Sequence, residues 1–214
     1  MADGYDYKEV TKWLKDWLAQ NGTISESDPE KLSKFMREFG EQVIDKAGYY
    51  NHSGANLILY SGDISDVRAW RIVEGYCNAN TGFYFISNTY AGGMLNNEDV
   101  ADAILEICGN DDTLMYRVCG WEVNGVRYST FGGELALDDR VSFNLASKAE
   151  GDVKFWGPNA VTGKVFSETE FRALLTNPNV TRLLLTSYFL LLTSSFFLFP
   201  AALELFSASG VSNI

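Results

Sequence analysis

The sequence has little of the side-chain chemistry on which many catalytic sites depend, with one histidine and three cysteines among 214 residues. The single histidine, His52, lies in a turn-like stretch. It is the one histidine that could serve as the base of a Ser-His-Asp triad or a Cys-His pair. Cys77, Cys108 and Cys119 are odd in number and match no zinc spacing. Walker A, G-x-S-x-G and H-E-x-x-H motifs are missing as well. We therefore expect no metal site and none of these enzyme classes. We also expect free thiols, with a Cys108–Cys119 disulfide as the alternative if the chain meets an oxidising compartment.

Basic residues are also scarce. Lys and Arg number 17 against 28 Asp and Glu, which gives a formal net charge of −11 and a pI of about 4.5. Such a surface repels nucleic-acid backbones and anionic lipids, so we expect no nucleic-acid partner. A small phosphorylated ligand held by backbone N–H groups remains compatible with it. The N-terminus shows no basic region before an apolar run, so no signal peptide is visible. The sequence leaves two locations open for the protein, either the cytoplasm or a membrane to which it is anchored.

The first fifty residues carry the pattern of two helices. Apolar residues recur at intervals of three and four over residues 5–20, and Asn21-Gly22 is typical of a helix end. Asp28 followed by Pro29 is typical of a helix cap and first turn. Residues 1–50 are therefore predicted to form a helical subdomain.

From residue 51 onward, short apolar runs alternate with helical stretches. This alternation is typical of an α/β domain, here residues 51–182, in which helices flank a mainly parallel sheet and the N-terminal helical layer packs against it. Asn124-Gly125 between two alternating runs predicts a β-hairpin over residues 114–131. The other expected strands are residues 56–60, 82–86, 152–156, 164–166 and 180–186, and the other expected helices are residues 65–77, 98–108, 138–148 and 168–175.

The C-terminal tail, residues 183–214, is apolar over most of its length. Leu183 to Leu203 contains no charged residue, and a run of about 20 apolar residues suffices to cross a bilayer core. Two interpretations stay open: a core strand that runs into a buried helix, or a membrane anchor through residues 183–203. Lys and Arg are sparse at both flanks, so an orientation cannot be argued.

Two stretches carry ordered sets of motifs. Residues 56–95 contain a strand that ends in Tyr60-Ser61, then a helix, a second strand, and Thr89 ahead of Gly93-Met94-Leu95. Residues 140–175 contain a helix, a strand and a short turn of helix. Their distinguishing residues are Ser142 and Ala146, Asp152-Val153, Val165-Phe166, and Glu170 with Leu174. In kind and in order, these motifs resemble those of the ADP-ribosyl cyclase / NAD glycohydrolase family.

The resemblance implies that Glu170 is the catalytic carboxylate, with Glu168 as the second candidate. NAD would be the substrate, and no cofactor is implied. A carboxylate beside the ribose would stabilise the positive charge that grows as nicotinamide leaves. The alternative is that both residues form a solvated helix start, where acidic side chains favour the positive end of the helix dipole. The substrate contacts implied are Tyr60, Ser61, Gly62, Ser87, Asn88, Thr89, Ser142 and Phe166.

Some of these contacts also have a physical argument of their own. Ser61 and Gly62 follow a strand and precede a helix, a place where α/β proteins bind phosphates, although an ordinary helix cap has the same pattern. The Tyr60 ring could stack on nicotinamide, or could serve only in packing. The Ser142 hydroxyl could reach the pyrophosphate, or could do nothing as a helix residue.

Three departures from the family pattern affect the interpretation. Animal members contain many disulfides, and the family has tryptophan where this chain has Tyr60. At Ser87 and Asn88 the family has an acidic residue linked to the balance between cyclisation and hydrolysis, so hydrolysis to nicotinamide and ADP-ribose is favoured here. The family's second site tryptophan has no clear match, and Trp121 and Phe131 are the candidates.

Three hypotheses of function follow. The first is an NAD glycohydrolase that acts as a toxin or in NAD signalling. A toxin of this kind would have an inhibitor or immunity protein as its partner. The second is a cyclase of the same family that makes cyclic ADP-ribose. The third is a non-catalytic, membrane-anchored binding protein, motivated by residues 183–203.

Overall fold

The computed structural model describes residues 6–49, 55–60, 63–64, 67–157, 169–186 and 203–207. The chain forms two compact units, each assembled from two stretches of sequence. Unit 1 contains residues 1–49 and 87–144, and unit 2 contains residues 50–86 and 145–214. The predicted sites at Ser61, Gly62, Phe166 and Glu168, and most of the apolar tail, lie outside the described residues.

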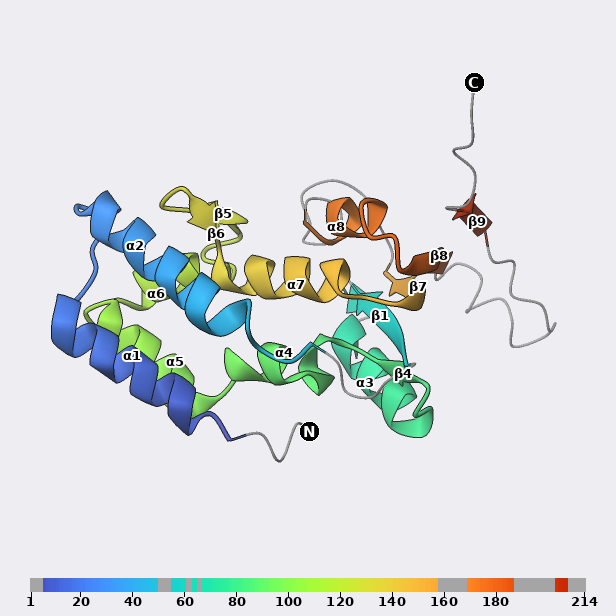
Figure 1. The fold of residues 1–214 in the computed structure, drawn as a ribbon, viewed down its shortest axis with the longest axis horizontal. Coiled ribbons are helices and arrows are strands. Elements are labelled where there is room, and N and C mark those ends of the chain that lie inside the picture. Colours follow the sequence, from blue (N-terminus) through green and yellow to red (C-terminus); the bar gives the residue numbers. More distant parts are fainter. Residues whose placement is uncertain are drawn as a thin grey trace, which may run out of the picture. The chain divides into compact units, whose positions relative to one another are not determined.

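Unit 1 is mainly helical, with a small two-stranded sheet (Figure 1). Its last helix, α7, continues into unit 2. The elements are α1 (Lys8–Asn21), α2 (Pro29–Phe39), the π-helix η1 (Gly40–Ile44), α4 (Tyr90–Met94), α5 (Glu98–Ile107), α6 (Asp112–Cys119), β5 (Thr130–Phe131), β6 (Glu134–Leu135) and α7 (Leu137–Ser147).

The first helices confirm the pattern expected from the sequence. The Asp28 side chain accepts a hydrogen bond from the Lys31 backbone N–H at 3.1 Å, and Pro29 occupies the first turn of α2. The apolar faces of the two helices are buried. The buried side chains are Val10, Leu14 and Trp17 from α1, and Leu32, Phe35, Met36 and Phe39 from α2.

The hairpin predicted over residues 114–131 is wrong in its first half, which forms α6. The Asp111 side chain caps this helix by accepting hydrogen bonds from the backbone N–H groups of Thr113 and Leu114. Apolar residues of α6 fall on one helical face, and Gly120, with φ of +80°, ends the helix. The Asn124-Gly125 turn does form, with positive φ at both residues, but only one isolated bridge flanks it. An apolar run of this length fits a buried helix as well as a strand, and the cap decides.

Unit 2 contains the main sheet, and it confirms the α/β class. The strand order is β4-β1-β7-β8-β9, in which the first three pairings are parallel and β9 runs antiparallel to β8. The elements are β1 (Asn56–Tyr60), β2 (Asp63–Ile64), β3 (Val67–Arg68), α3 (Ala69–Ala79), β4 (Phe83–Tyr84), β7 (Gly151–Trp156), α8 (Phe171–Leu175), β8 (Val180–Thr186) and β9 (Leu203–Ser207), with the short η2 (Ile86–Asn88) at the junction of the units.

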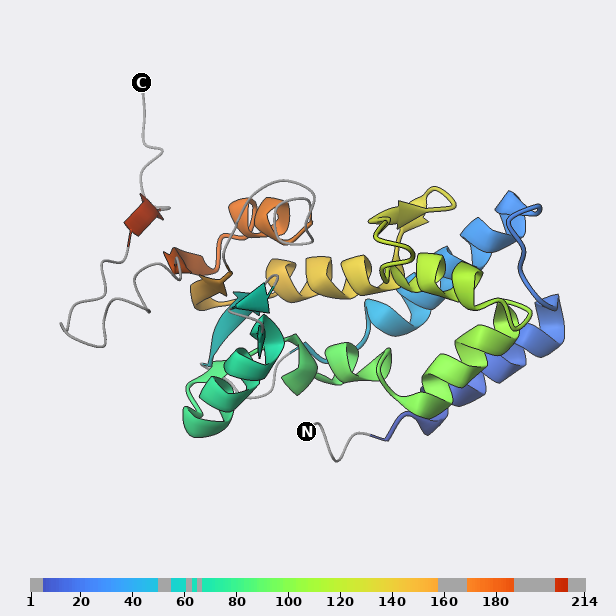
Figure 2. The same ribbon diagram turned by 180° about the vertical axis from the view of Figure 1, so that it is seen from behind.

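The two helices of unit 2 lie on opposite sides of the sheet. A parallel β-α-β crossover is right-handed in nearly all proteins. The crossover through α3 leads from β1 outward to β4, and the crossover through α8 leads from β7 outward to β8, in the other direction. Right-handed crossovers in opposite directions place their helices on opposite faces, and both views of the ribbon show this arrangement (Figures 1 and 2).

The described part of the apolar tail belongs to the sheet. Residues Leu183 to Thr186 complete β8, and the next described residues form β9. No helix in the described parts of the chain is both long enough and apolar enough to cross a bilayer.

Candidate functional site at the carboxyl edge of the sheet

The sheet of unit 2 has one topological switch point, between β1 and β7. From β1 the chain continues through α3 to β4, which lies on one side of β1 in the strand order. From β7 it continues through α8 to β8, which lies in the opposite direction. In open α/β sheets, ligands bind outside the carboxyl ends of the strands at such a point, because the two diverging connections leave a crevice there. Tyr60 and Trp156 are the last residues of these two strands.

Glu170 lies on the connection that leaves β7. It precedes α8 directly, and only 6% of its surface is exposed. In a β-α-β crossover the helix runs antiparallel to the strands, so its first residues lie toward their carboxyl ends. The candidate carboxylate is therefore buried on the side of the sheet edge where a ligand is expected. The alternative interpretation places Glu170 in a solvated helix start. That interpretation does not agree with the burial of the side chain.

The position of α8 is fixed from its other end by Asn177. The Nδ2 atom of Asn177 donates hydrogen bonds to the backbone carbonyls of Ala146 at 2.9 Å and Ala149 at 2.8 Å. Its Oδ1 atom accepts a hydrogen bond from the Asn179 backbone N–H at 2.9 Å. This buried amide ties the segment between α8 and β8 to the end of α7, and so supports the short helix that carries Glu170.

Tyr60 ends β1 with a half-buried ring. It contacts Phe85 edge-on, with ring centroids 6.1 Å apart, and packs against the core between β1 and α3. Trp156 stands opposite Tyr60 in the register of β1 and β7. We did not single out Trp156 from the sequence, because only the pairing register brings residues 96 positions apart together. Trp121 and Phe131, the candidates from sequence order, belong to unit 1.

The remaining predicted contacts that the structure describes belong to unit 1. Thr89 is fully buried, and its hydroxyl caps α4 by accepting a hydrogen bond from the Gly92 N–H at 3.0 Å. Ser142 is buried on α7, whereas Ser87 and Asn88 are half-buried in η2. The structure therefore gives Thr89 a role in the fold. The substrate contacts of Thr89, Ser142, Ser87 and Asn88 stay predictions.

Nucleophilic catalysis by cysteine has no support in the structure. All three cysteines are free and buried. Burial raises the pKa of Cys77 to about 11 and that of Cys108 to about 12, so neither forms the reactive thiolate at neutral pH. Among the described residues, no group of three or more histidine, cysteine or acidic side chains is arranged to hold a metal ion.

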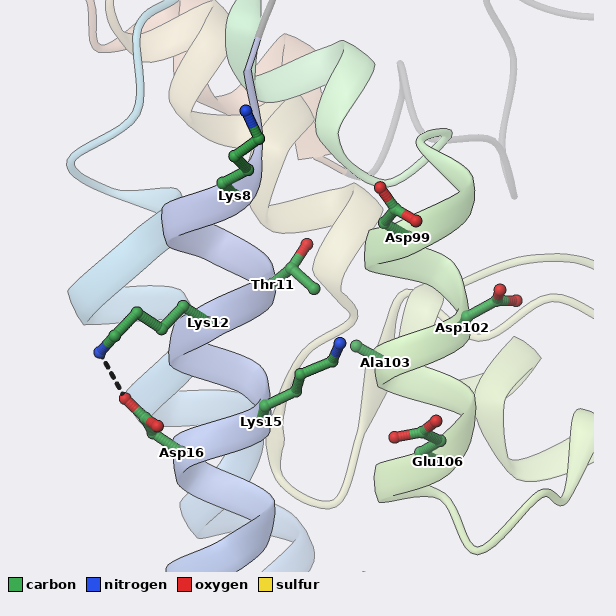
Figure 3. Close-up of a pocket in the computed structure, with 9 residues that line it drawn as sticks. All are labelled: Lys8, Thr11, Lys12, Lys15, Asp16, Asp99, Asp102, Ala103 and Glu106. Atoms are coloured by element: carbon green, nitrogen blue, oxygen red, sulfur yellow. Dashed lines mark hydrogen bonds and ion pairs between the residues drawn. The ribbon is translucent and has the colours of Figure 1, made fainter.

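A groove of about 580 Å³ lies between α1 and α5 in unit 1. Figure 3 shows a row of lysines on one wall and a row of carboxylates on the other. Every charged side chain that lines the groove is exposed, and Lys12 pairs with Asp16 on its own helix at 2.8 Å. Exposed charges of this kind interact weakly with each other, and none of the predicted site residues lines the groove.

The chain was also compared with known proteins. No protein-family model, no curated protein and no solved structure matches it.

Proposed function

We propose that the protein is an NAD glycohydrolase that uses Glu170 as its catalytic carboxylate. The observation that carries the proposal is the burial of this acidic side chain at the start of α8, on the connection that leaves the switch point of the sheet. Electrostatic interactions are stronger where water is excluded, so a buried carboxylate can stabilise a nearby positive charge more than an exposed one can. The order of motifs that resembles the ADP-ribosyl cyclase family places the same residue at the ribose.

In the proposed reaction, the bond between ribose C1′ and the nicotinamide nitrogen breaks, and its electron pair leaves with neutral nicotinamide. Water then attacks C1′, its oxygen forms the new bond, and one proton is released with ADP-ribose. Positive charge on the ribose peaks between these events. The Glu170 carboxylate would stabilise that charge in a site from which water is partly excluded, where electrostatic interactions are stronger than in bulk water.

The test is release of nicotinamide from NAD by the purified chain, for the wild type and for Glu170→Gln. Glutamine keeps the size and hydrogen-bonding capacity of the side chain but removes its charge. We expect a loss of kcat of at least about 100-fold, as for removal of other transition-state charge partners, with an unchanged circular dichroism spectrum. Glu106→Gln, which changes an exposed carboxylate of α5, is the matched control. Full activity in Glu170→Gln would disprove the assignment of this residue.

Product analysis separates the second candidate, a cyclase. We expect mainly linear ADP-ribose, because Ser87 and Asn88 occupy the position at which the family pattern has an acidic residue. Cyclic ADP-ribose as the main product would favour the cyclase instead.

A further inference from the structure

We propose that an exposed row of aromatic side chains in unit 1 binds a proline-rich segment of a partner protein that carries basic residues beside its prolines. The aromatic row consists of Tyr116, Trp121, Tyr128 and Phe131, which all belong to unit 1. The candidate site at the carboxyl edge of the sheet belongs to unit 2. The inference therefore goes beyond the proposed function and does not depend on it.

The first step is that the four rings are connected. The rings of Tyr116 and Trp121 lie 5.5 Å apart between centroids, with 71° between their planes. Those of Tyr128 and Phe131 lie 6.5 Å apart, with 48° between their planes. Arg117 follows Tyr116 on α6, and its guanidinium lies 5.8 Å from the centroid of the Tyr128 ring. This contact joins the two ring pairs into one row.

The second step explains why the row faces solvent. Arg127 binds Asp139 on α7 and so holds this part of the chain against that helix. Successive side chains of an extended segment point to opposite sides, so Val126 and Tyr128 point away from α7. They are 48% and 41% exposed, and Tyr116 is 40% exposed. Among the described residues, these three are a majority of the five large hydrophobic side chains that are exposed, and such a concentration is typical of an interaction surface.

The third step concerns the charge beside the aromatic row. Arg117 already has a carboxylate partner, Glu26. Asp112 lies one helical turn before the tyrosine of α6, Glu122 directly follows the tryptophan, and both are exposed. These carboxylates, on a chain with a formal net charge of −11, attract a basic ligand and repel nucleic acids and anionic membranes.

The fourth step is the shape of the ligand. Rings inclined to one another by 48° and 71° do not form one flat platform, so they suit a series of separate apolar groups better than a single planar base. A polyproline II helix presents its prolines in this way, is preformed before binding, and docks on exposed aromatic rings in several domain families. Tyrosine and tryptophan are also among the residue types that contribute most to binding energy at protein interfaces.

The probe is a synthetic peptide of consecutive prolines flanked by arginines, titrated into the full chain by calorimetry. We expect Trp121→Ala and Tyr128→Ala each to raise its dissociation constant at least about tenfold. Phe143→Ala is the matched control, because Phe143 is also an exposed aromatic residue of unit 1, on α7, and we expect the affinity to stay unchanged there. Thermal unfolding of each variant reports on the fold.

A charge reversal gives a result that misfolding cannot mimic. Two further peptides serve here, one with glycine and serine in place of the prolines and one with glutamates in place of the arginines. We expect both to bind the wild type more weakly than the original peptide. Glu122→Lys should weaken the binding of the arginine-flanked peptide and strengthen that of the glutamate-flanked peptide.

The outcomes decide the inference as follows. Losses in Trp121→Ala and Tyr128→Ala, together with the changed peptide preference of Glu122→Lys, support it. Absence of binding by the proline peptide up to about 1 mM overturns it. Equal binding of the glycine-serine peptide also overturns it, because charge alone would then explain the attraction, as does an equal loss in Phe143→Ala. A protein that binds the proline peptide but cleaves no NAD would fail the proposed function and leave this inference intact.

Discussion

Arg140 holds Asp45 with two hydrogen bonds, from Nε at 2.8 Å and from Nη2 at 2.5 Å. The pair joins α7 to the end of η1, and Asn144 adds a third hydrogen bond to the same carboxylate at 2.8 Å. A planar guanidinium that meets a carboxylate through two nitrogens is both directional and stronger than a single exposed ion pair. This contact fixes the first helices of unit 1 to α7 across 95 residues of sequence.

We predict that Asp45→Asn lowers the free energy of unfolding by about 1–2 kcal/mol, because the charged hydrogen bonds from Arg140 become neutral ones. Urea unfolding followed by circular dichroism measures this change. Asp16→Asn is the matched control, since Asp16 pairs with the exposed Lys12 on the same helix, and we expect no measurable loss there. Equal losses in the two variants would contradict a special role for the Arg140 pair.

Gly40 gives a sharper test of the same contact. A Cβ atom at Gly40 would lie 2.4 Å from the Arg140 guanidinium, so Gly40→Ala must displace that group from Asp45. The backbone of Gly40 is helical, and alanine alone would favour such a backbone by about 1 kcal/mol. We predict that Gly40→Ala destabilises the wild-type protein but stabilises the Arg140→Ala variant. A double-mutant cycle by urea unfolding measures the reversal, and the same sign in both backgrounds would contradict it.

The sequence was sufficient for the parts of this fold in which local signals and burial agree. The cap at Asp28, the apolar faces of α1 and α2, and the strand at residues 56–60 follow from such signals. The prediction of the first half of the hairpin was wrong, because a short apolar run is equally compatible with a buried helix and with a strand. The pairing of Tyr60 with Trp156 could not be predicted, since it depends on which strands become neighbours and in what register.

Asp138 should make the stability of the protein depend on pH. Burial raises the pKa of Asp138 from its ordinary 3.8 to about 6, and the neighbouring Asp139 adds to the rise although Arg127 opposes it. A carboxyl with a higher pKa in the folded state binds its proton more tightly when folded. Its contribution to stability is therefore largest below pH 4 and declines as the pH rises toward 6.

We predict that the free energy of unfolding of the wild type, relative to Asp138→Asn, falls by about 1 kcal/mol between pH 4 and pH 6.5. This value is reduced from the full shift because the Asp138 side chain is 35% exposed. Urea unfolding at half-unit pH steps provides the measurement. The prediction is contradicted if the difference in the free energy of unfolding between the wild type and Asp138→Asn stays constant with pH, or if the wild type gains stability relative to the variant as the pH rises. Either result would show that folding does not disfavour the ionised carboxylate.

The thiols offer a test of burial in both units. Burial raises the pKa of Cys77, Cys108 and Cys119 alike. We predict that the native protein reacts with a thiol reagent such as DTNB at least about 100-fold more slowly than the urea-unfolded chain, in which all three thiols titrate near pH 8.5. Rapid reaction of one thiol in the native protein would show that its helix opens locally. Cys77→Ser would identify whether that helix is α3.

Asn177 connects the stability of unit 2 to the candidate site. Its amide donates to two backbone carbonyls, so Asn177→Asp removes both donors and directs a negative charge at the carbonyl oxygens of Ala146 and Ala149. We predict a loss of about 3 kcal/mol at pH 7, and a smaller loss at pH 4, where a protonated aspartate restores one donor. Because the same contacts support α8, NAD cleavage at pH 7 should fall in this variant through kcat. Asn179→Asp, which changes an exposed neighbouring side chain, is the control and should leave kcat unchanged. A destabilised Asn177→Asp protein with the kcat of the wild type would separate the anchoring of α8 from catalysis.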